Sequence, residues 1–168
     1  MGLFIPRHGE AGKKLSSGSS DFDRPLTDTG KREVTDIAKS LKNFGVTFNF
    51  IITSPLKRAY QTASIMAKAF KRENNIENWD ELKPEGNSRD FYRKLSKRFE
   101  QDSAILIVGH EPYLSSLISE IISDADTSSH VVLKKAGLAK IRITSQTQIM
   151  HGELKWLLTP RLMKNISK

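Results

Sequence analysis

Residues 104–112 read Ala-Ile-Leu-Ile-Val-Gly-His-Glu-Pro, and they indicate the fold more directly than any other stretch. The first five residues are apolar without alternation, which is typical of a strand that is buried on both faces. Gly109 ends the apolar run, and His110 follows it at once. The stretch therefore predicts the central strand of a mainly parallel sheet, with an ionisable side chain at its carboxyl end.

Other short apolar runs and helical periodicities surround this strand. Extended segments are expected at 3–5, 48–53, 131–133, 138–144 and 154–158. Helices are expected from Thr27 or Thr29 to Gly45, from Ser54-Pro55 to Phe70 with the proline in the first turn, and over 88–99 and 114–122. This order predicts an α/β protein, a three-layer α/β/α sandwich with a mainly parallel central sheet and helices on both faces.

Length and composition limit the classes of protein that remain. The 168 residues fit one domain, expected over 1–160, with a basic and frayed tail at 161–168. The chain has no cysteine, which excludes disulfides, a cysteine nucleophile, cysteine-bound zinc and iron–sulfur clusters. No apolar run approaches the roughly 20 residues of a membrane helix, and no signal peptide precedes the first strand, so a cytoplasmic protein with no membrane partner is expected.

The net charge of +8 favours an anionic partner such as nucleic acid, a membrane surface or a phosphorylated substrate. A well-solvated basic surface explains the same charge equally well, and charge alone does not choose between these interpretations. The helix expected over 88–99 carries a basic outer face, which we interpret as solvated rather than as a docking site.

Polar side chains follow the predicted strands where each strand ends. Arg7 and His8 come after the first strand, Arg58 lies shortly after the second, and His110 follows the central one. In open α/β sheets ligands bind beyond the carboxyl ends of the strands, so we expect these side chains to converge. Taken alone, each of them is more often an ordinary surface or core residue, and only the joint arrangement points to function.

Two guanidinium groups and two imidazole rings suit a doubly negative, tetrahedral anion. Arginine offers a planar fork of donors to phosphate oxygens, and a neutral histidine can attack as a nucleophile. Phosphoryl transfer needs mainly positioning and charge neutralisation, which such a set provides. The sequence has no Asp-x-Asp or clustered His/Asp/Glu pattern, so neither a metal nor another cofactor is expected.

Four ordered blocks of sequence resemble the histidine phosphatase superfamily, whose fold is the phosphoglycerate-mutase-like fold. The resemblance extends to about residue 145 and rests on Arg7-His8-Gly9-Glu10, Arg24-Pro25-Leu26-Thr27 with Gly30, Thr53–Ala59 with Gln61-Thr62-Ala63, and Val108–Pro112. The short length leaves little room for segments that cap the pocket in larger members. The chain is therefore most similar to the small phosphohistidine phosphatases of the superfamily.

The resemblance implies a role for each matching residue. His8 would receive the phosphoryl group, Arg7 and Arg58 would clamp its oxygens, and His110 would donate a hydrogen bond from the opposite side. For this, one ring nitrogen of His8 must be unprotonated, so its other nitrogen should donate to a nearby carbonyl. His110 should favour its charged form beside the phosphate.

Two further residues are expected to contribute to phosphate binding. Gly9 would let the backbone approach the phosphate closely. Arg24 would reach in from the far end of the loop 12–23.

One departure from the family pattern concerns the general acid. Many relatives place a glutamate in a Leu-x-Glu context after the second helix, whereas here Pro84 stands at the matching position. Glu85 or Glu81 are the possible substitutes. Without a well-placed acid, hydrolysis of alkyl phosphates is slowed because their alkoxide leaving group needs a proton. Hydrolysis of phosphohistidine depends less on such an acid, because its leaving nitrogen is readily protonated.

We therefore predict a metal-independent phosphohistidine phosphatase whose partner is a phosphorylated protein, such as a histidine phosphotransfer domain. The first alternative is a phosphomonoesterase that acts on a small phosphorylated metabolite, with Glu85 as its acid. The second is a noncatalytic anion or nucleic-acid binder, which is ranked last because the chain has no recognisable nucleic-acid motif.

Overall fold

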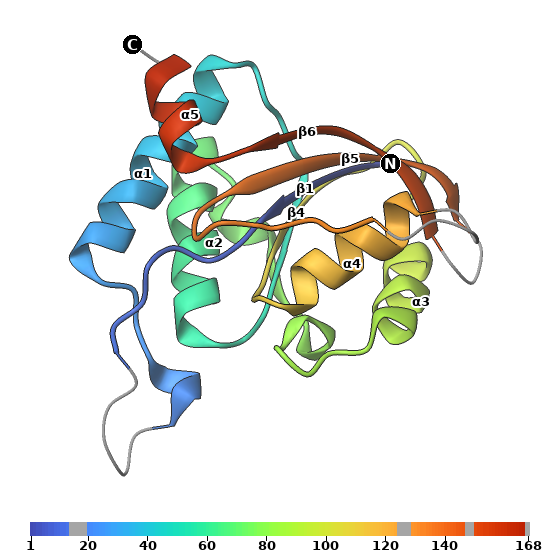
Figure 1. Ribbon diagram of the computed structural model, residues 1–168, viewed down its shortest axis with the longest axis horizontal. Helices are drawn as coiled ribbons and strands as arrows, with labels where there is room; N and C mark the ends of the chain where they lie inside the picture. Colours follow the sequence, from blue (N-terminus) through green and yellow to red (C-terminus); the bar gives the residue numbers. More distant parts are fainter. Residues whose placement is uncertain (14–19, 124–128, 147–149, 167–168) are drawn as a thin grey trace.

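A six-stranded sheet forms the centre of the molecule in a computed structural model, which describes residues 1–13, 20–123, 129–146 and 150–166 (Figure 1). The strands lie in the order β3-β2-β4-β1-β5-β6. Their bounds are β1 (Gly2–Pro6), β2 (Phe50–Thr53), β3 (Ile76–Asn78), β4 (Ala104–Val108), β5 (Leu138–Gln146) and β6 (Met150–Leu158). The first four strands in this order run parallel and the last two pair antiparallel, so the predicted mainly parallel sheet, with β4 inside it, is confirmed.

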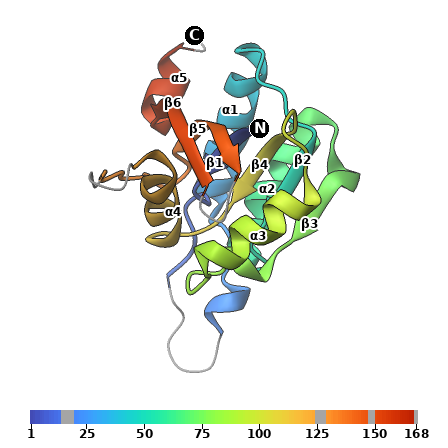
Figure 2. The same cartoon turned by 90° about the vertical axis from the view of Figure 1, so that its right-hand side faces the viewer.

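Helices cover both faces of this sheet, as Figures 1 and 2 show. Their bounds are α1 (Asp28–Asn43), α2 (Lys57–Phe70), α3 (Ser88–Arg98), α4 (Tyr113–Ile122) and α5 (Pro160–Ile166), with short 3-10 turns η1 (Asp21–Asp23), η2 (Glu73–Asn75) and η3 (Asp80–Leu82). Successive residues of β4 enter opposite cores: Ile105 packs with α3 and α4, and Leu106 packs with α1, α2 and α5. The predicted three-layer sandwich is therefore confirmed.

Local sequence signals explain where the longer helices begin. Thr27 caps α1, because its hydroxyl oxygen accepts the Gly30 N–H at 2.9 Å. Asn87 caps α3 in the same way, because its side-chain oxygen accepts the backbone N–H groups of Arg89 and Asp90. Before α2, Pro55 does not lie in the first turn as expected; the helix begins at Lys57, because Leu56 keeps an extended backbone.

The last third and the polar middle segment differ from the sequence-based expectations. Residues 76–78 form β3, an edge strand whose partly exposed side chains lack an apolar pattern. Residues 160–166 form α5 rather than a frayed tail, because Met163 is fully buried in the core shared with α1 and α2. Residues 131–133 are not a strand, and residues 167–168 lie outside the described residues. Among the described helices, none is long and apolar enough to cross a bilayer.

Candidate active site

Backbone pairing extends past the ends of β1, β2 and β4 and brings the predicted residues together. The N–H of His8 donates to the carbonyl of Gly109 at 3.2 Å, and the N–H of Ser54 donates to the carbonyl of Val108 at 3.0 Å. The residues that follow three parallel strands are thereby held side by side. As a result, the ring centroids of His8 and His110 are 5.0 Å apart.

The His8 ring presents its Nε2 atom without a proton. Its Nδ1 lies 2.7 Å from the carbonyl oxygen of Gly9, which can only accept, so Nδ1 carries the hydrogen. On the other side of the ring, Nε2 accepts the Nε–H of Arg58 at 3.3 Å. The expectation that one nitrogen of His8 donates to a carbonyl is confirmed, and the other carries the lone pair that a nucleophile needs.

Both imidazole rings favour the neutral form. Burial lowers the pKa of His8 to about 4, although its hydrogen bond to Gly9 acts in the opposite direction, and the neighbouring arginines lower it further. Burial, then His8 and the same arginines, lower the pKa of His110 to about 3. The charged His110 expected from the sequence depends on a phosphate beside the ring and stays a prediction; among the groups of the protein itself, a ring buried near guanidinium groups is costly to protonate.

The guanidinium of Arg58 is held in place by Asp21, a residue to which the sequence analysis gave no role. Arg58 is 3% exposed, and its Nη1 and Nη2 donate to the backbone carbonyl and the carboxylate of Asp21 at 2.8 and 2.9 Å. Burial lowers the pKa of Arg58 while the Asp21 carboxylate raises it. A guanidinium has five N–H donors, of which Asp21 and His8 take three. The remaining donors can bind an oxyanion next to Nε2 of His8.

Arg7 and Arg24 lie close enough to both imidazole rings to affect their pKa values. Nη1 of Arg7 donates to the Leu133 carbonyl at 3.1 Å. Arg24 pairs with the second carboxylate oxygen of Asp21 at 3.0 Å and donates to the Gly12 carbonyl at 3.3 Å. In each arginine Nε is buried without a hydrogen-bond partner among the described residues, and each charge lowers the pKa values of both histidines. Of the loop 12–23, residues 14–19 lie outside the described residues.

Gly9 has a packing role that the structure shows, while its expected approach to phosphate stays a prediction. Its N–H donates to the hydroxyl of Thr62 at 3.1 Å, so this donor is already engaged. A Cβ at this position would lie 2.7 Å from Cγ2 of Val34, closer than real contacts allow. Gly9 therefore lets the His8 loop pack directly on α1, and its carbonyl fixes the His8 ring.

The two glutamates suggested as general acids make no described contact with the imidazole pair. Both carboxylate oxygens of Glu81 accept from Nζ of Lys94, at 3.0 and 2.8 Å. Glu85 is exposed, and the structure gives its carboxylate no partner among the described residues. Asp21, in contrast, pairs through its carboxylate with Arg58, the arginine that is hydrogen-bonded to the His8 ring. No group of three or more His, Cys, Asp or Glu side chains in the described ranges could hold a metal ion.

Ser54 and Thr62 also belong to the immediate surroundings, and both hydroxyl groups are completely buried. Ser54 contacts the His110 ring, and Thr62 links Gly9 to the Arg58 carbonyl. Arg58 was selected because it follows a predicted strand, and the same criterion would have selected Ser54. Thr62 could have been identified from its position one helical turn after Arg58 on α2.

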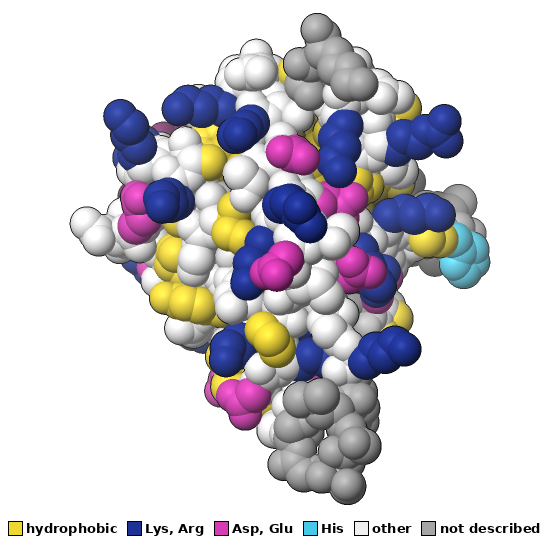
Figure 3. Space-filling view, turned by 90° about the vertical axis from the view of Figure 1, so that its left-hand side faces the viewer, with side chains coloured by type: hydrophobic (Ala, Val, Ile, Leu, Met, Phe, Trp, Pro, Cys, Tyr) yellow, Lys and Arg dark blue, Asp and Glu magenta, His cyan; other side chains and the backbone are white. Residues whose placement is uncertain are grey.

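The basic face of α3 is largely paired with carboxylates. Arg93, Lys94 and Arg98 form ion pairs of 2.8–3.1 Å with Asp90, Glu81 and Glu77, respectively. On the side of the molecule shown in Figure 3, Lys and Arg side chains also alternate with Asp and Glu instead of gathering in one patch. These features are typical of a solvated surface.

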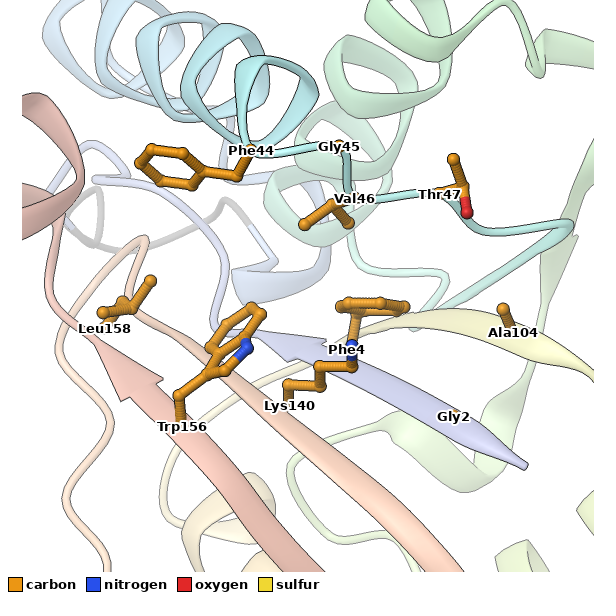
Figure 4. Close-up of a pocket in the computed structure, with 10 residues that line it drawn as sticks. All are labelled: Gly2, Phe4, Phe44, Gly45, Val46, Thr47, Ala104, Lys140, Trp156 and Leu158. Atoms are coloured by element: carbon orange, nitrogen blue, oxygen red, sulfur yellow. The ribbon is translucent and has the colours of Figure 1, made fainter. Parts of the chain in front are cut away.

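A separate cavity of about 610 Å³ opens at the amino ends of β1 and β4, away from the imidazole pair. Phe4, Trp156 and Leu158 line its apolar floor, with Lys140 beside Phe4 (Figure 4). The described cavity contains no histidine or carboxylate, so it is not a second site for the same chemistry.

Comparisons with known proteins agree with this geometry. The family model described as "Histidine phosphatase superfamily (branch 1)" matches residues 3–84. An uncharacterized protein of Picosynechococcus sp. is 37% identical over 165 residues, which cover 96% of this chain and 98% of the relative. A broad-specificity phosphatase of Saccharomyces cerevisiae is 35% identical over 75 residues, or 43% of this chain and 32% of that protein.

A similar solved structure has the same architecture along nearly its whole length. It is that of the protein histidine phosphatase SixA complexed with tungstate, with a TM-score of 0.83 and 25% identity over 96% of this chain and 98% of SixA. Together, the sheet, the imidazole pair and these similarities lead to one assignment. The chain belongs to branch 1 of the histidine phosphatase superfamily and is a phosphatase of that superfamily.

Proposed function

We propose that the protein removes phosphoryl groups from phosphohistidine on proteins, through a covalent intermediate on His8. The observation that carries this proposal is the orientation of the His8 ring. Its Nδ1 is tied to the Gly9 carbonyl, so the lone pair of Nε2 faces the Arg58 guanidinium, where a phosphoryl oxygen would bind.

The proposed reaction has two displacements at phosphorus. In the first, Nε2 of His8 forms a P–N bond while the bond to the leaving imidazole breaks, and the leaving ring takes a proton from solvent. Arg58 and Arg7 offset the negative charge on the phosphoryl oxygens. In the second, water attacks phosphorus, the bond to Nε2 breaks, and inorganic phosphate is released.

The choice of phosphohistidine over alkyl phosphates follows from the acids near the site. Glu81 is committed to Lys94, and Glu85 is exposed. An alkoxide leaving group needs a positioned proton donor, whereas the nitrogen of a phosphoramidate is readily protonated. The similarity to the protein histidine phosphatase SixA supports the same substrate class, and hence a phosphorylated protein such as a histidine phosphotransfer domain as partner.

A phosphomonoesterase acting on small metabolites is the second candidate. The observation in its favour is the partial similarity to a broad-specificity yeast phosphatase. Such an activity would require Glu85 to move toward the leaving group. Replacement of Glu85 by Gln would then abolish ester hydrolysis.

The experiment compares two substrates with the same purified protein. A histidine phosphotransfer domain carrying labelled phosphohistidine and an alkyl ester, glycerol phosphate, are incubated in parallel, and released phosphate is measured. We expect release from phosphohistidine at a much higher kcat/KM, loss of both activities in His8→Ala, and normal rates in Lys57→Ala, which changes an exposed cation next to Arg58. Release from the ester but not from phosphohistidine would refute the substrate assignment.

A further inference from the structure

The hydroxyl of Ser54 lies against the His110 ring inside the protein. Its Oγ is 2.9 Å from Nε2 of His110, and the two residues are 0% and 1% exposed. The main-chain pairing of Ser54 with Val108 fixes this contact, because it seats Ser54 beside the turn that carries His110. Only one hydrogen can lie between these two atoms, so either the Ser54 hydroxyl or Nε2 of His110 is the donor.

The surroundings of Ser54 indicate that the hydroxyl is the donor. Oγ already accepts the N–H of Leu56 at 3.3 Å. Its single hydrogen needs an acceptor, because a buried hydroxyl rarely leaves its donor unused. Nε2 of His110 is the acceptor that the described contacts provide, and a nitrogen that accepts carries no hydrogen.

A neutral imidazole that accepts at one nitrogen carries its hydrogen on the other. Nδ1 of His110 is buried and has no hydrogen-bond partner among the described residues. It belongs to a ring whose centroid is 5.0 Å from that of His8, so the ring that carries this donor packs against the ring of the proposed nucleophile. With the opposite tautomer, Nδ1 would present a lone pair to an incoming oxyanion and repel it.

We propose that Ser54 is a positioning residue: by donating to Nε2, it fixes His110 as the neutral Nδ1–H tautomer, which then donates to a phosphoryl oxygen. The second half of this proposal rests on the proposed phosphatase function, whereas the first half does not. Since burial, then His8 and the neighbouring arginines, all disfavour a positive His110, a neutral donor suits this site better than an imidazolium.

The proposal is tested first by nitrogen NMR of the wild-type protein with ¹⁵N-labelled histidine at pH 7. The four histidines are assigned by single substitutions, with His110→Gln identifying the ring in question. We expect Nδ1 of His110 to give the shift of a protonated nitrogen and Nε2 that of an unprotonated one. The reverse pattern, or protons on both nitrogens, would overturn the proposal. No substrate is involved, so this result is independent of any catalytic activity.

Substitutions then test the effect on turnover. Ser54→Ala should redistribute the His110 proton in the NMR spectrum and lower kcat about 10-fold with little change in KM, which corresponds to one neutral hydrogen bond. Ser54→Thr keeps the hydroxyl and should restore both. The control is Ser64→Ala, which removes an exposed hydroxyl bonded to the Tyr60 carbonyl. An unchanged proton distribution and kcat in a folded Ser54→Ala protein would overturn the role of Ser54. An Nδ1–H ring in a protein without phosphatase activity would instead refute the proposed function.

Discussion

Replacement of Asp21 by Ala should slow the reaction although Asp21 is not expected to touch the reacting atoms. Asp21 anchors Arg58 through two hydrogen bonds of 2.8 and 2.9 Å, and only the second involves its side chain. A hydrogen bond to a charged group contributes about 1.5–3 kcal/mol. Because the Asp21 side chain is 38% exposed, we take the lower end, about 1.5 kcal/mol, which corresponds to a roughly tenfold loss of kcat.

The same substitution removes a negative charge next to the proposed phosphate site. Inorganic phosphate should therefore inhibit the variant at least as strongly as it inhibits the wild type, while kcat falls. Steady-state kinetics with a phosphohistidine substrate and competition by phosphate measure both quantities. Asp23→Ala is the matched control, because this neighbouring carboxylate is exposed and has no described side-chain partner. Wild-type kcat in Asp21→Ala, or an equal loss in Asp23→Ala, would refute the anchoring role.

Three further predictions follow from the buried site. The pKa of His8, lowered to about 4, predicts that kcat/KM stays level from pH 7 down to about pH 5 and falls as the pH passes 4, when Nε2 gains a proton; a midpoint near 6.5 in the pH–rate profile would contradict it. The pKa of His8 in the unfolded chain is about 6.5, so between pH 6.5 and 4 the unfolded chain binds more protons than the folded protein. As the pH is lowered through this window, the free energy of unfolding of the wild type should therefore decrease by up to about 1.4 kcal/mol per pH unit more than that of His8→Asn. Urea unfolding at several pH values measures this difference, and parallel curves for the two proteins would exclude it. Gly9→Ala should destabilise the fold by about 1–3 kcal/mol, since its Cβ would lie 2.7 Å from Val34, and Val34→Ala should recover part of the loss in a double-mutant cycle; additive effects would argue against the clash.

Much of the fold could be predicted from local patterns. The unbroken apolar run 104–108 identified an internal strand, and the cap and periodicity of α1 and the periodicity of α3 gave their extents closely. Elements whose stability comes from neighbours were missed. The edge strand β3 depends on backbone pairing with β2, and α5 is held by Met163 in a core built from distant helices.

The candidate site was predictable in part for a geometric reason. Parallel strands end at one edge of a sheet, so residues after successive strands converge, and His8, Arg58 and His110 do so. Pairings between side chains could not be read from spacing. Asp21 precedes Arg58 by 37 residues, and nothing in either segment signals that they meet. The direction of the His110 pKa shift also needed the packed structure, because the burial of the ring and the charges around it depend on residues that are distant along the chain.

The central claim is that Nε2 of His8 becomes phosphorylated during turnover. The most direct measurement is rapid quenching of the enzyme with a labelled phosphohistidine substrate under alkaline conditions, followed by peptide mass spectrometry and ³¹P NMR of the adduct. We expect a phosphoryl group on Nε2 of His8, present in Lys57→Ala and absent in His8→Asn. Turnover without an adduct, or an adduct on Nδ1 or on another residue, would contradict the account.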